Sequence, residues 1–506
     1  MKKPDILFLM CDQFRFDCIH ALGNAGIDTP NLDRLAARGL TFSDAYSTCP
    51  VCVPARYTAR TGCEPFHTGC YENETPKAMD GQPKEMRKRC GPYLAEAMRE
   101  RGYETFGIGK FHTMPQFDED LGYDLQLNTE ELWATKEERA KDAFARFIAE
   151  EHPEYSHIEQ LHGERTNMYY MPQQSPLPAE LTVERFAAQE AVKQIGKNRE
   201  KPYFGFVSFV GPHPPCAPPI PYNRYYNPDR MPLPRETDAA IDHMDEQIPW
   251  MNHLIWADGM NDFLIQNLKS RYYGEITYID DCIGRILAAV EAGGNAENTL
   301  ICFFSDHGDH LGDHHAWQKE SYFEASCHVP FLLSWPARWQ PGVCDQLVCL
   351  TDLFGIATAA AGDEELRDGH PVIRVLDGQE IRREYLFACY GRPGTPRFKC
   401  MVRSGSWKYI WLANGGREQL FDLSEHRRED ELFNEIRPDI LRQLRRTAER
   451  HCRREGLWQA LAGTGFLEFP YEERPKMRIR QFDESSGVYE FIDKSSAMKH
   501  ERSARL

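Results

Sequence analysis

Two polar clusters follow apolar runs of strand length. Asp12 and Gln13 follow the run at 6–10, and Ser305-Asp306-His307-Gly308-Asp309-His310 follows the run at 299–304. Because ligands in open α/β sheets bind beyond the carboxyl ends of the strands, the two clusters would converge if these strands are neighbours. Carboxylate and amide oxygens with one imidazole suit Ca²⁺, Mg²⁺ or Mn²⁺ better than Zn²⁺. An aspartate that caps a turn, or solvated histidines at a helix start, would be the structural alternative.

The segment from Cys49 to Arg56, Cys-Pro-Val-Cys-Val-Pro-Ala-Arg, is a second candidate for chemistry. As a zinc site, Cys49-x-x-Cys52 lacks a second CxxC pair, and as a redox pair it lacks the small unit in which thioredoxin-type motifs occur. At the start of a helix, Cys52 would lie where backbone amides and the helix dipole favour an anion, with Arg56 one turn further along to bind oxyanions. A buried apolar cysteine is the ordinary alternative for any of the 16 cysteines.

The elements that must position these residues are an alternation of apolar strands and helices. Further strands are expected at 40–46, 102–109, 203–209 and 330–335, and helices at 30–39, 52–62, 183–195 and 263–292. Thr29 is expected to cap the helix at 30–39, with Pro30 in its first turn. The alternation predicts an α/β fold with a large, mostly parallel sheet that is sandwiched by helices.

The character of the sequence changes after residue 362. Strands are expected at 401–409 and 419–423, around the turn Asn414-Gly415-Gly416, and a charged helix at about 437–454. We therefore predict an α/β domain over 1–362 and a smaller C-terminal α+β subdomain with an antiparallel sheet over 363–465. An irregular, charged tail is expected over 466–506.

Composition narrows the classes of partner. In 506 residues, 77 acidic and 60 basic side chains give a net charge of −17, which argues against a nucleic-acid coat and against binding to an anionic membrane surface. A pocket can still be basic, so an anionic small substrate remains compatible with this charge. No apolar run approaches the roughly 20 residues that span a bilayer. The run at 6–10 is too short for a secretory leader, so we expect a cytoplasmic protein with reduced cysteines.

Cys52-x-Pro54-x-Arg56, followed by Thr61-Gly62, resembles the motif of the sulfatases, a family of the alkaline phosphatase superfamily. The resemblance covers most of the chain and implies an alkaline phosphatase-like fold. Further stretches that occur in the family's order are Pro4-Asp5-Ile6-Leu7 to Asp12-Gln13, Thr29 to Ala36, Gly109-Lys110-Phe111-His112, Pro212-His213-Pro214, Ser305 to Gly308, Lys319 with Tyr322-Phe323-Glu324 and His328-Val329-Pro330, and Trp407-Lys408-Tyr409.

The resemblance implies a nucleophile and a metal site. In this family the cysteine of the motif, here Cys52, is converted to formylglycine (3-oxoalanine) by a dedicated maturation enzyme. The hydrated aldehyde attacks sulfur, and its second hydroxyl later expels sulfate. Ca²⁺ is the expected divalent metal, with Mn²⁺ or Mg²⁺ as alternatives. The metal ligands that the resemblance implies are Asp12, Gln13, Asp306 and His307.

The resemblance also implies roles for the cations and histidines. Arg56 and Lys110 would orient and stabilise the modified side chain, and His112 would take the proton during elimination. His213 and Lys319 would contact the sulfate. His213 would donate the proton to the leaving oxygen.

Three positions depart from the family's usual pattern. Ala55 replaces a serine, Phe111 replaces a tryptophan, and Gln13 stands where many sulfatases carry a second aspartate. Gln13 leaves two carboxylates to balance one divalent cation. Gln13 together with His307 also occurs in phosphonate monoester hydrolases, which weakens the choice of calcium over manganese and of sulfate over phosphoryl substrates.

The sequence therefore predicts a sulfuric ester hydrolase that acts on a sulfated small molecule or oligosaccharide. Family analogy alone points to a sulfated carbohydrate. The alternative is a phosphonate monoester hydrolase or phosphodiesterase with the same nucleophile. A non-catalytic sulfoglycan- or metal-binding protein would keep the fold but leave Cys52 unmodified. Besides the substrate, the expected partner is the maturation enzyme, and no nucleic acid or membrane partner is expected.

Overall fold

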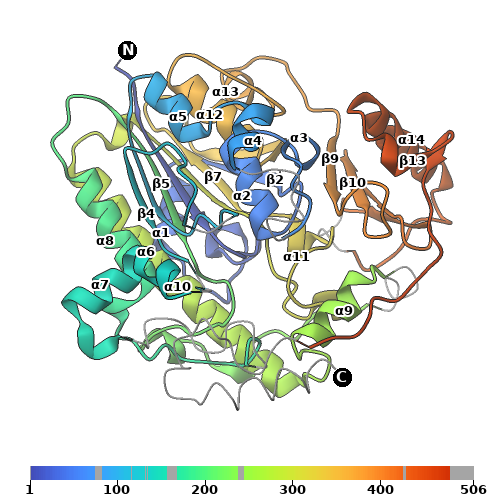
Figure 1. The fold of residues 1–506 in the computed structure, drawn as a ribbon, viewed down its shortest axis with the longest axis horizontal. Helices are drawn as coiled ribbons and strands as arrows, with labels where there is room; N and C mark the ends of the chain where they lie inside the picture. The colour runs from blue at the N-terminus through green and yellow to red at the C-terminus, as the bar shows by residue number, and fades with distance from the viewer. Residues whose placement is uncertain are drawn as a thin grey trace.

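An eight-stranded sheet forms the centre of the protein in a computed structural model, which describes residues 2–73, 83–114, 117–130, 133, 135–156, 168–237, 244–424 and 429–478 (Figure 1). The strand order is β4-β3-β5-β1-β6-β7-β2-β8. The strands are β1 (Asp5–Cys11), β2 (Leu40–Tyr46), β3 (Glu104–Gly109), β4 (Leu125–Asn128), β5 (Tyr203–Phe209), β6 (Thr299–Ser305), β7 (Phe331–Ser334) and β8 (Gly342–Cys349). Neighbouring strands are parallel except where β7 meets β2 and β6. The predicted mostly parallel sheet is confirmed.

The apolar runs form central strands because both faces of these strands are buried. Every residue of β5 and of β6 is buried. In β1, Phe8 and Met10 belong to the hydrophobic core on one face of the sheet, and Leu7 and Leu9 belong to the core on the other. A strand covered on both sides needs apolar residues at every position rather than at alternate ones.

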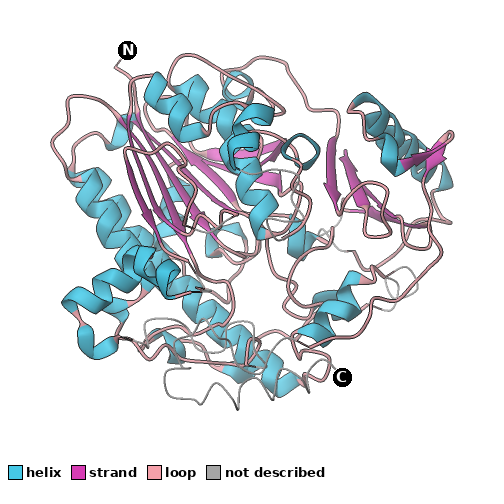
Figure 2. Ribbon diagram, viewed as in Figure 1, coloured by secondary structure: helices cyan, strands magenta, loops and turns pink. Residues whose placement is uncertain are grey.

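Helices cover both faces of this sheet (Figure 2). One face packs against α2 (Cys52–Thr61), α4 (Pro83–Cys90), α5 (Leu94–Glu100), α12 (Asp352–Ala360) and α13 (Val372–Leu376). The other face packs against α1 (Pro30–Ala37), α8 (Val183–Ile195) and the 31-residue α10 (Asp262–Ala292). Shorter helices lie in the connections: α3 (Pro65–Thr68), α6 (Lys136–Lys141), α7 (Ala143–Glu151), α9 (Gln247–Leu254) and α11 (Glu324–Cys327). The four helices predicted from the sequence over this part of the chain are confirmed.

A second sheet follows in the C-terminal part of the chain. It is antiparallel, in the order β12-β11-β10-β9, and Figure 1 shows it beside the large α/β unit, in orange to red. Its strands are β9 (Leu386–Tyr390), β10 (Lys399–Ser404), β11 (Trp407–Leu412) and β12 (Arg417–Asp422), and the 17-residue α14 (Pro438–Arg454) packs on one face. A two-stranded hairpin, β13 (Leu461–Ala462) and β14 (Gly465–Phe466), follows. The predicted antiparallel sheet is confirmed.

Two local predictions are corrected by the structure. The strand expected at 401–409 is two strands, β10 and β11, which turn at Gly405 with φ 58°, a left-handed conformation that glycine adopts easily. The hydroxyl of Thr29 does not cap α1; it accepts from the backbone N–H of His20 and donates to Asp33.

The division of the chain at residues 362 and 465 stays a prediction. Helix α13 lies beyond residue 362 and contributes Val372 and Ile373 to the core beneath the large sheet. Most of the predicted tail lies outside the described residues.

Two expectations from composition concern cysteines and membranes. All 16 cysteines lie in the described part of the chain, and all are free thiols. Within the same residues, none of the helices combines the length and the apolar character that crossing a bilayer requires.

Candidate active site

The carboxyl edge of the large sheet gathers the predicted residues. The strands β3, β5, β1 and β6 are consecutive neighbours and run parallel. Cys11 and Ser305 are partners in register, so the residues that follow them leave the sheet side by side. The convergence of the two polar clusters is therefore confirmed. The residues that leave this edge are Lys110 after β3, His213 in the loop after β5, Asp12 after β1 and Asp306 after β6.

Cys52 is the first residue of α2. The Asn73 Oδ1 atom accepts a hydrogen bond from the backbone N–H of Val53 at 2.9 Å, which satisfies one of the amides that a helix start leaves without an internal partner. Gly62 ends the helix in a left-handed conformation with φ 67°. The positive end of the helix dipole therefore lies at Cys52.

Four buried side chains meet at this helix start, namely those of Asp12, Cys52, Asp306 and His307. One ligand atom of each lies within 4.8 Å of the corresponding atoms of the others. Cys52 Sγ is 3.3 Å from His307 Nε2 and 3.8 Å from Asp12 Oδ1. None of the four residues is more than 1% exposed. The thiol therefore points into the polar centre and not into an apolar core.

Arg56 and Lys110 neutralise the two carboxylates. Arg56 donates from Nη2 to Asp12 Oδ2 and from Nε to Asp306 Oδ2, both at 3.0 Å. Lys110 Nζ lies 2.5 Å from Asp12 Oδ2. The rigid guanidinium plane bridges two separate carboxylates, which the single ammonium of a lysine does not do in the same geometry.

These charges shift the pKa values in the centre. Burial alone would raise the pKa of Asp12, but Lys110, His213 and further cations hold it well below its usual range. Burial, and then the carboxylate of Asp12, raise the pKa of Cys52 to about 11. An unmodified Cys52 is therefore a thiol at neutral pH, and a thiol is a poor nucleophile.

Hydrogen bonds fix the protonated nitrogen of two histidines. His307 Nδ1 lies 3.0 Å from Gly308 O, and His213 Nδ1 lies 2.7 Å from Pro214 O. Because a carbonyl oxygen only accepts, Nδ1 carries the proton in both rings. The lone pair on His307 Nε2 then faces the centre, as the lone pair of a metal-ligating histidine does. His213 Nε2 lies 3.2 Å from the hydroxyl of Tyr169.

Gln13 and Lys319 meet at the same centre. Lys319 Nζ donates to Gln13 Oε1 at 2.7 Å. Gln13 has φ 64°, and Lys319 lies between Gln318 and Glu320, which have φ 69° and 72°. Non-glycine residues in this left-handed region are strained and persist only where the surrounding structure holds them. Three of the strained residues therefore lie at or beside this one contact of the site.

His112 is placed through its backbone. Its N–H donates to Glu130 Oε1 at 2.8 Å, and the N–H of Phe111 donates to the same oxygen at 3.1 Å. The ring of His112 is buried two residues beyond Lys110, and its role as proton acceptor stays a prediction. The contact of Glu130 with the site could not be predicted from the sequence, because Glu130 follows a strand that has no clear apolar pattern.

Other buried residues of the site could not be predicted from the sequence either. Asp309 belongs to the polar cluster after β6, but nothing in that cluster assigns it a partner. Its Oδ2 atom accepts from Tyr170 and from the amide of Gln13. Tyr169 and Tyr170 lie far from every motif, so only the folded chain brings them to His213 and Gln13.

The donor set fits a hard divalent cation. Two carboxylates, one imidazole nitrogen with its lone pair directed inward and the amide oxygen of Gln13 are the donors that Ca²⁺, Mg²⁺ or Mn²⁺ accept. The zinc and redox interpretations of Cys49 with Cys52 gain no support. Cys49 Sγ faces Tyr71 O at 3.4 Å, away from this group.

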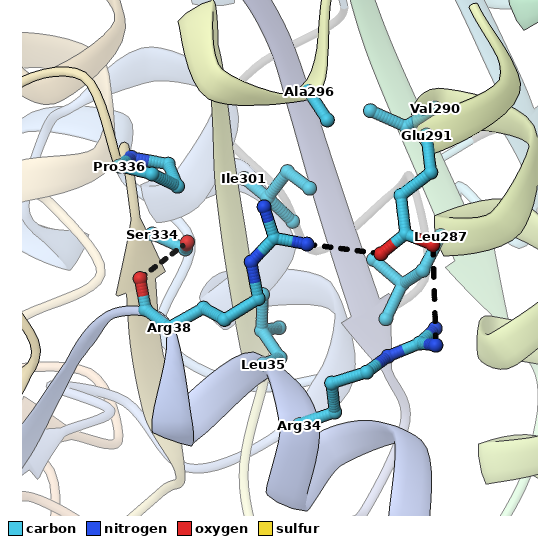
Figure 3. Close-up of a pocket in the computed structure, with 10 residues that line it drawn as sticks. All are labelled: Arg34, Leu35, Arg38, Leu287, Val290, Glu291, Ala296, Ile301, Ser334 and Pro336. Atoms are coloured by element: carbon cyan, nitrogen blue, oxygen red, sulfur yellow. Dashed lines mark hydrogen bonds and ion pairs between the residues drawn. The ribbon is translucent and has the colours of Figure 1, made fainter. Parts of the chain in front are cut away.

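The cavity drawn in Figure 3 is a separate feature. It measures about 30 Å³ and lies where α1 and the end of α10 meet the beginning of β6. An ion pair between Arg38 and Glu291, 2.9 Å long, crosses its lining (Figure 3). Its place at the amino end of β6 is opposite to the edge that carries Asp306, and its volume suits about one water molecule.

Comparisons with known proteins agree with this geometry. The sequence model of the Sulfatase family matches residues 4–362. An arylsulfatase from Clostridium perfringens is 27% identical over 444 residues, which cover 84% of this chain and 89% of that protein. A choline-sulfatase from Rhizobium meliloti is 28% identical over 455 residues, which cover 83% of this chain and 80% of that protein.

Solved structures of other proteins share this fold. The phosphonate monoester hydrolase of Agrobacterium radiobacter superposes with a TM-score of 0.73 over 90% of this chain and 96% of that one, at 24% sequence identity. The matched family region contains the whole centre, from the ligands after β1 to Lys319. The chain therefore belongs to the sulfatase family, the sulfuric ester hydrolases of the alkaline phosphatase superfamily.

Proposed function

We propose that this enzyme hydrolyses sulfate monoesters with residue 52, in its formylglycine form, as the nucleophile. One observation carries the proposal: Cys52 Sγ stands at the start of α2, 3.3 Å from His307 Nε2 and 3.8 Å from Asp12 Oδ1, inside the group that would hold the cation. Attack on an anionic ester needs a nucleophile that is fixed beside positive charge, and this arrangement supplies it.

Four residues would hold the cation, for which we propose Ca²⁺: Asp12, Gln13, Asp306 and His307. When bound, the cation draws charge from the non-bridging oxygens of the sulfate. The hydrated aldehyde at residue 52 supplies two hydroxyl groups, one to attack sulfur and one to release sulfate afterwards, which neither a serine nor a cysteine can provide.

The surrounding residues bind, orient and move protons. Arg56 and Lys110 hold Asp12 in place beside residue 52, and Lys319 offers its ammonium to the sulfate. His213 holds one proton at Nδ1 through Pro214 O, so a second proton at Nε2 is the one it would give to the leaving oxygen. His112 would take the proton from the remaining hydroxyl of residue 52 during release.

The proposed protein partner is the enzyme that converts the cysteine. Every residue of α2, including Cys52 and Arg56, is buried in the folded protein. A second protein cannot reach a side chain that is 1% exposed, so conversion has to precede folding of this segment.

A sulfated carbohydrate is the proposed substrate class. The ring of Tyr169 lies 5.9 Å from that of the proposed proton donor His213, and Tyr170 lies 5.5 Å from both Tyr169 and Trp317. The three rings are buried, at 3–5% exposure, so they are proposed to form the wall behind the proton donor and not an open platform for the sugar.

A phosphonate monoester or phosphodiester is the second candidate substrate. The observation in its favour is Gln13, which contributes a neutral oxygen where an aspartate would add a negative charge. A centre with one negative charge fewer tolerates a more negative transition state.

The experiment is an activity screen of protein that is co-produced with the maturation enzyme. Mass spectrometry of the peptide that contains residue 52 first measures its conversion. Initial rates are then compared on sulfated mono- and disaccharides, choline sulfate, an aryl sulfate and an aryl phosphonate. We expect kcat/KM on the best sulfate ester to exceed that on the phosphonate by at least about tenfold, which is about 1.4 kcal/mol. The opposite ranking would favour the second candidate, and converted but inactive protein would favour a binding role.

A further inference from the structure

The amide of Gln13 is oriented by a carboxylate that no motif assigns to the site. Gln13 Nε2 donates to Asp309 Oδ2, and it lies 3.1 Å from the hydroxyl of Tyr170. An aspartate carboxylate only accepts hydrogen bonds, so the NH₂ end of the amide must face Asp309. The oxygen end then faces Lys319 Nζ at 2.7 Å, on the side of the ion site.

Asp309 is itself held rigidly. It is 0% exposed. Its Oδ2 atom accepts from the hydroxyl of Tyr170, and its Oδ1 atom accepts from the backbone N–H of Leu311 at 2.8 Å. With both oxygens engaged, the carboxylate cannot turn away from Gln13.

Asp309 lies one hydrogen bond behind a proposed metal ligand. It holds the NH₂ end of the Gln13 amide, and Lys319 contacts the oxygen end. Groups that orient a metal ligand in this way raise the affinity of the site for its metal.

We infer that Asp309 is a positioning residue, which fixes the amide oxygen of Gln13 toward the ion site. The inference rests on the proposed ion site. Lys319, which only donates, favours the same orientation, so the loss of Asp309 removes one of the groups that hold the amide. A turned amide would place its NH₂ group against both Lys319 and a cation.

The test exchanges the amide of residue 13 and the carboxylate of residue 309. Asp309→Asn alone replaces the carboxylate by an amide. The one oxygen of Asn accepts from the backbone N–H of Leu311, so the NH₂ group of Asn faces the NH₂ group of Gln13, and the amide of Gln13 has to turn. Gln13→Glu alone places two buried carboxylates in contact. The double variant Gln13→Glu with Asp309→Asn restores a carboxylate–amide pair of the same size and the same total charge.

The readout is Ca²⁺ affinity, measured by titration calorimetry of metal-stripped protein and checked by the Ca²⁺-dependent rise in Tm. We expect Asp309→Asn to weaken binding about 10- to 100-fold, the range for groups that orient metal ligands. The exchanged double variant should return to within about threefold of the unsubstituted protein. The matched control is Asp313→Asn, which removes a buried carboxylate of the same loop that pairs with Arg15 and not with Gln13, and it should bind Ca²⁺ normally.

Each result supports or overturns the inference. Normal binding by Asp309→Asn, or a double variant no better than the single ones, would overturn it. Should a single variant fail to fold, the double variant must still fold and bind Ca²⁺, and its failure would also overturn the inference. Equal binding by the unsubstituted protein and Asp306→Ala would show instead that the proposed ion site is wrong, and the inference would fall with it.

Discussion

The buried charges around Cys52 form one network, in which one cation contacts two carboxylates and one carboxylate contacts two cations. Two carboxylates, Asp12 and Asp306, face the cations Arg56, Lys110 and Lys319 within a region that water does not reach. A buried charge that loses its partner costs several kcal/mol, so the removal of one member disturbs the others. The excess of positive charge is what an anionic sulfate ester would meet on entry.

The first prediction concerns the nucleophile. Cys52→Ala should lower turnover of an aryl sulfate by at least about 10³-fold, because no other residue can supply the attacking hydroxyl. Folding should be largely kept, because the change removes one sulfur atom at the edge of a polar centre. Initial rates and thermal unfolding measure the two effects.

The matched control for this prediction is Cys49→Ala. Cys49 is equally buried, but its sulfur faces Tyr71 O and lies outside the ion group. Its activity should stay within about threefold of the unsubstituted protein. A near-normal rate in Cys52→Ala would remove this residue from the mechanism.

The second prediction concerns the bridge between the carboxylates. Arg56→Lys should lower kcat/KM by about 10²-fold, because one ammonium cannot bond Asp12 and Asp306 together. Arg60→Lys is the control one turn further along α2, since among the described residues Arg60 donates to the backbone oxygens of Arg56 and Phe111 and to no carboxylate. Equal losses in the two variants, measured as kcat/KM, would mean that the bridge has no special role.

Residue types and spacing predict only part of the site. Asp12, Asp306, His307 and Cys52 can be found from the sequence, because each directly follows a strand or begins a helix whose pattern is clear. Tyr170 cannot, because its position relative to Gln13 depends on how a long connection crosses the sheet edge.

At the scale of elements, the strand order decides the site. The four strands that carry it are neighbours, although their order in the chain is β1, β3, β5 and β6. The apolar runs predict that these strands exist and are central, since they are buried on both faces. Their adjacency depends on crossovers, which hydrophobic patterning does not contain. At Gly405 the pattern predicts one strand where the structure has two. The residues on both sides of the turn favour a strand, so the pattern does not indicate the turn.

The third prediction concerns α14. His451 on this helix stacks on Phe387, with ring centroids 4.0 Å apart, and its Nδ1 atom lies 3.0 Å from Arg454 Nη2. A guanidinium only donates, so Nδ1 accepts and the ring is neutral. Burial, and then the charge of Arg454, lower the pKa of His451 to about 3.

The sign of the resulting pH effect follows from proton binding. Between about pH 6.5 and pH 3 the unfolded chain binds a proton at His451 and the folded protein does not, so stability falls as the pH drops through this window. The loss of Tm between pH 7 and pH 4.5 should therefore be smaller in His451→Phe than in the unsubstituted protein. An unchanged slope in His451→Phe would contradict the prediction.

At the scale of the whole molecule, buried ion pairs join the two sheets. Lys408 on β11 of the C-terminal sheet lies 2.8 Å from Glu324 of α11 and 2.7 Å from Glu429. His328 lies 2.9 Å from the other oxygen of Glu324. On the same side, Lys399 of β10 donates to the backbone oxygen of Glu320, next to Lys319 of the site. The C-terminal sheet therefore supports a segment of the active site as well as its own core.

The last prediction is that Lys408→Met destabilises the protein by about 3–5 kcal/mol, because two carboxylates are left in a water-free region without their cation. Burial raises the pKa of Glu429 to about 7; Lys408 opposes this rise, and the carboxylate of Glu324 adds to it. Protonation of Glu429 removes one of the two charges, so the loss should be largest above pH 7 and smaller at pH 5. Urea unfolding at the two pH values measures both effects. The control is Lys193→Met, which breaks an exposed ion pair with Glu190 and should cost less than about 1 kcal/mol at either pH. If the two variants lost equal stability, the buried ion pairs would not be what joins the sheets.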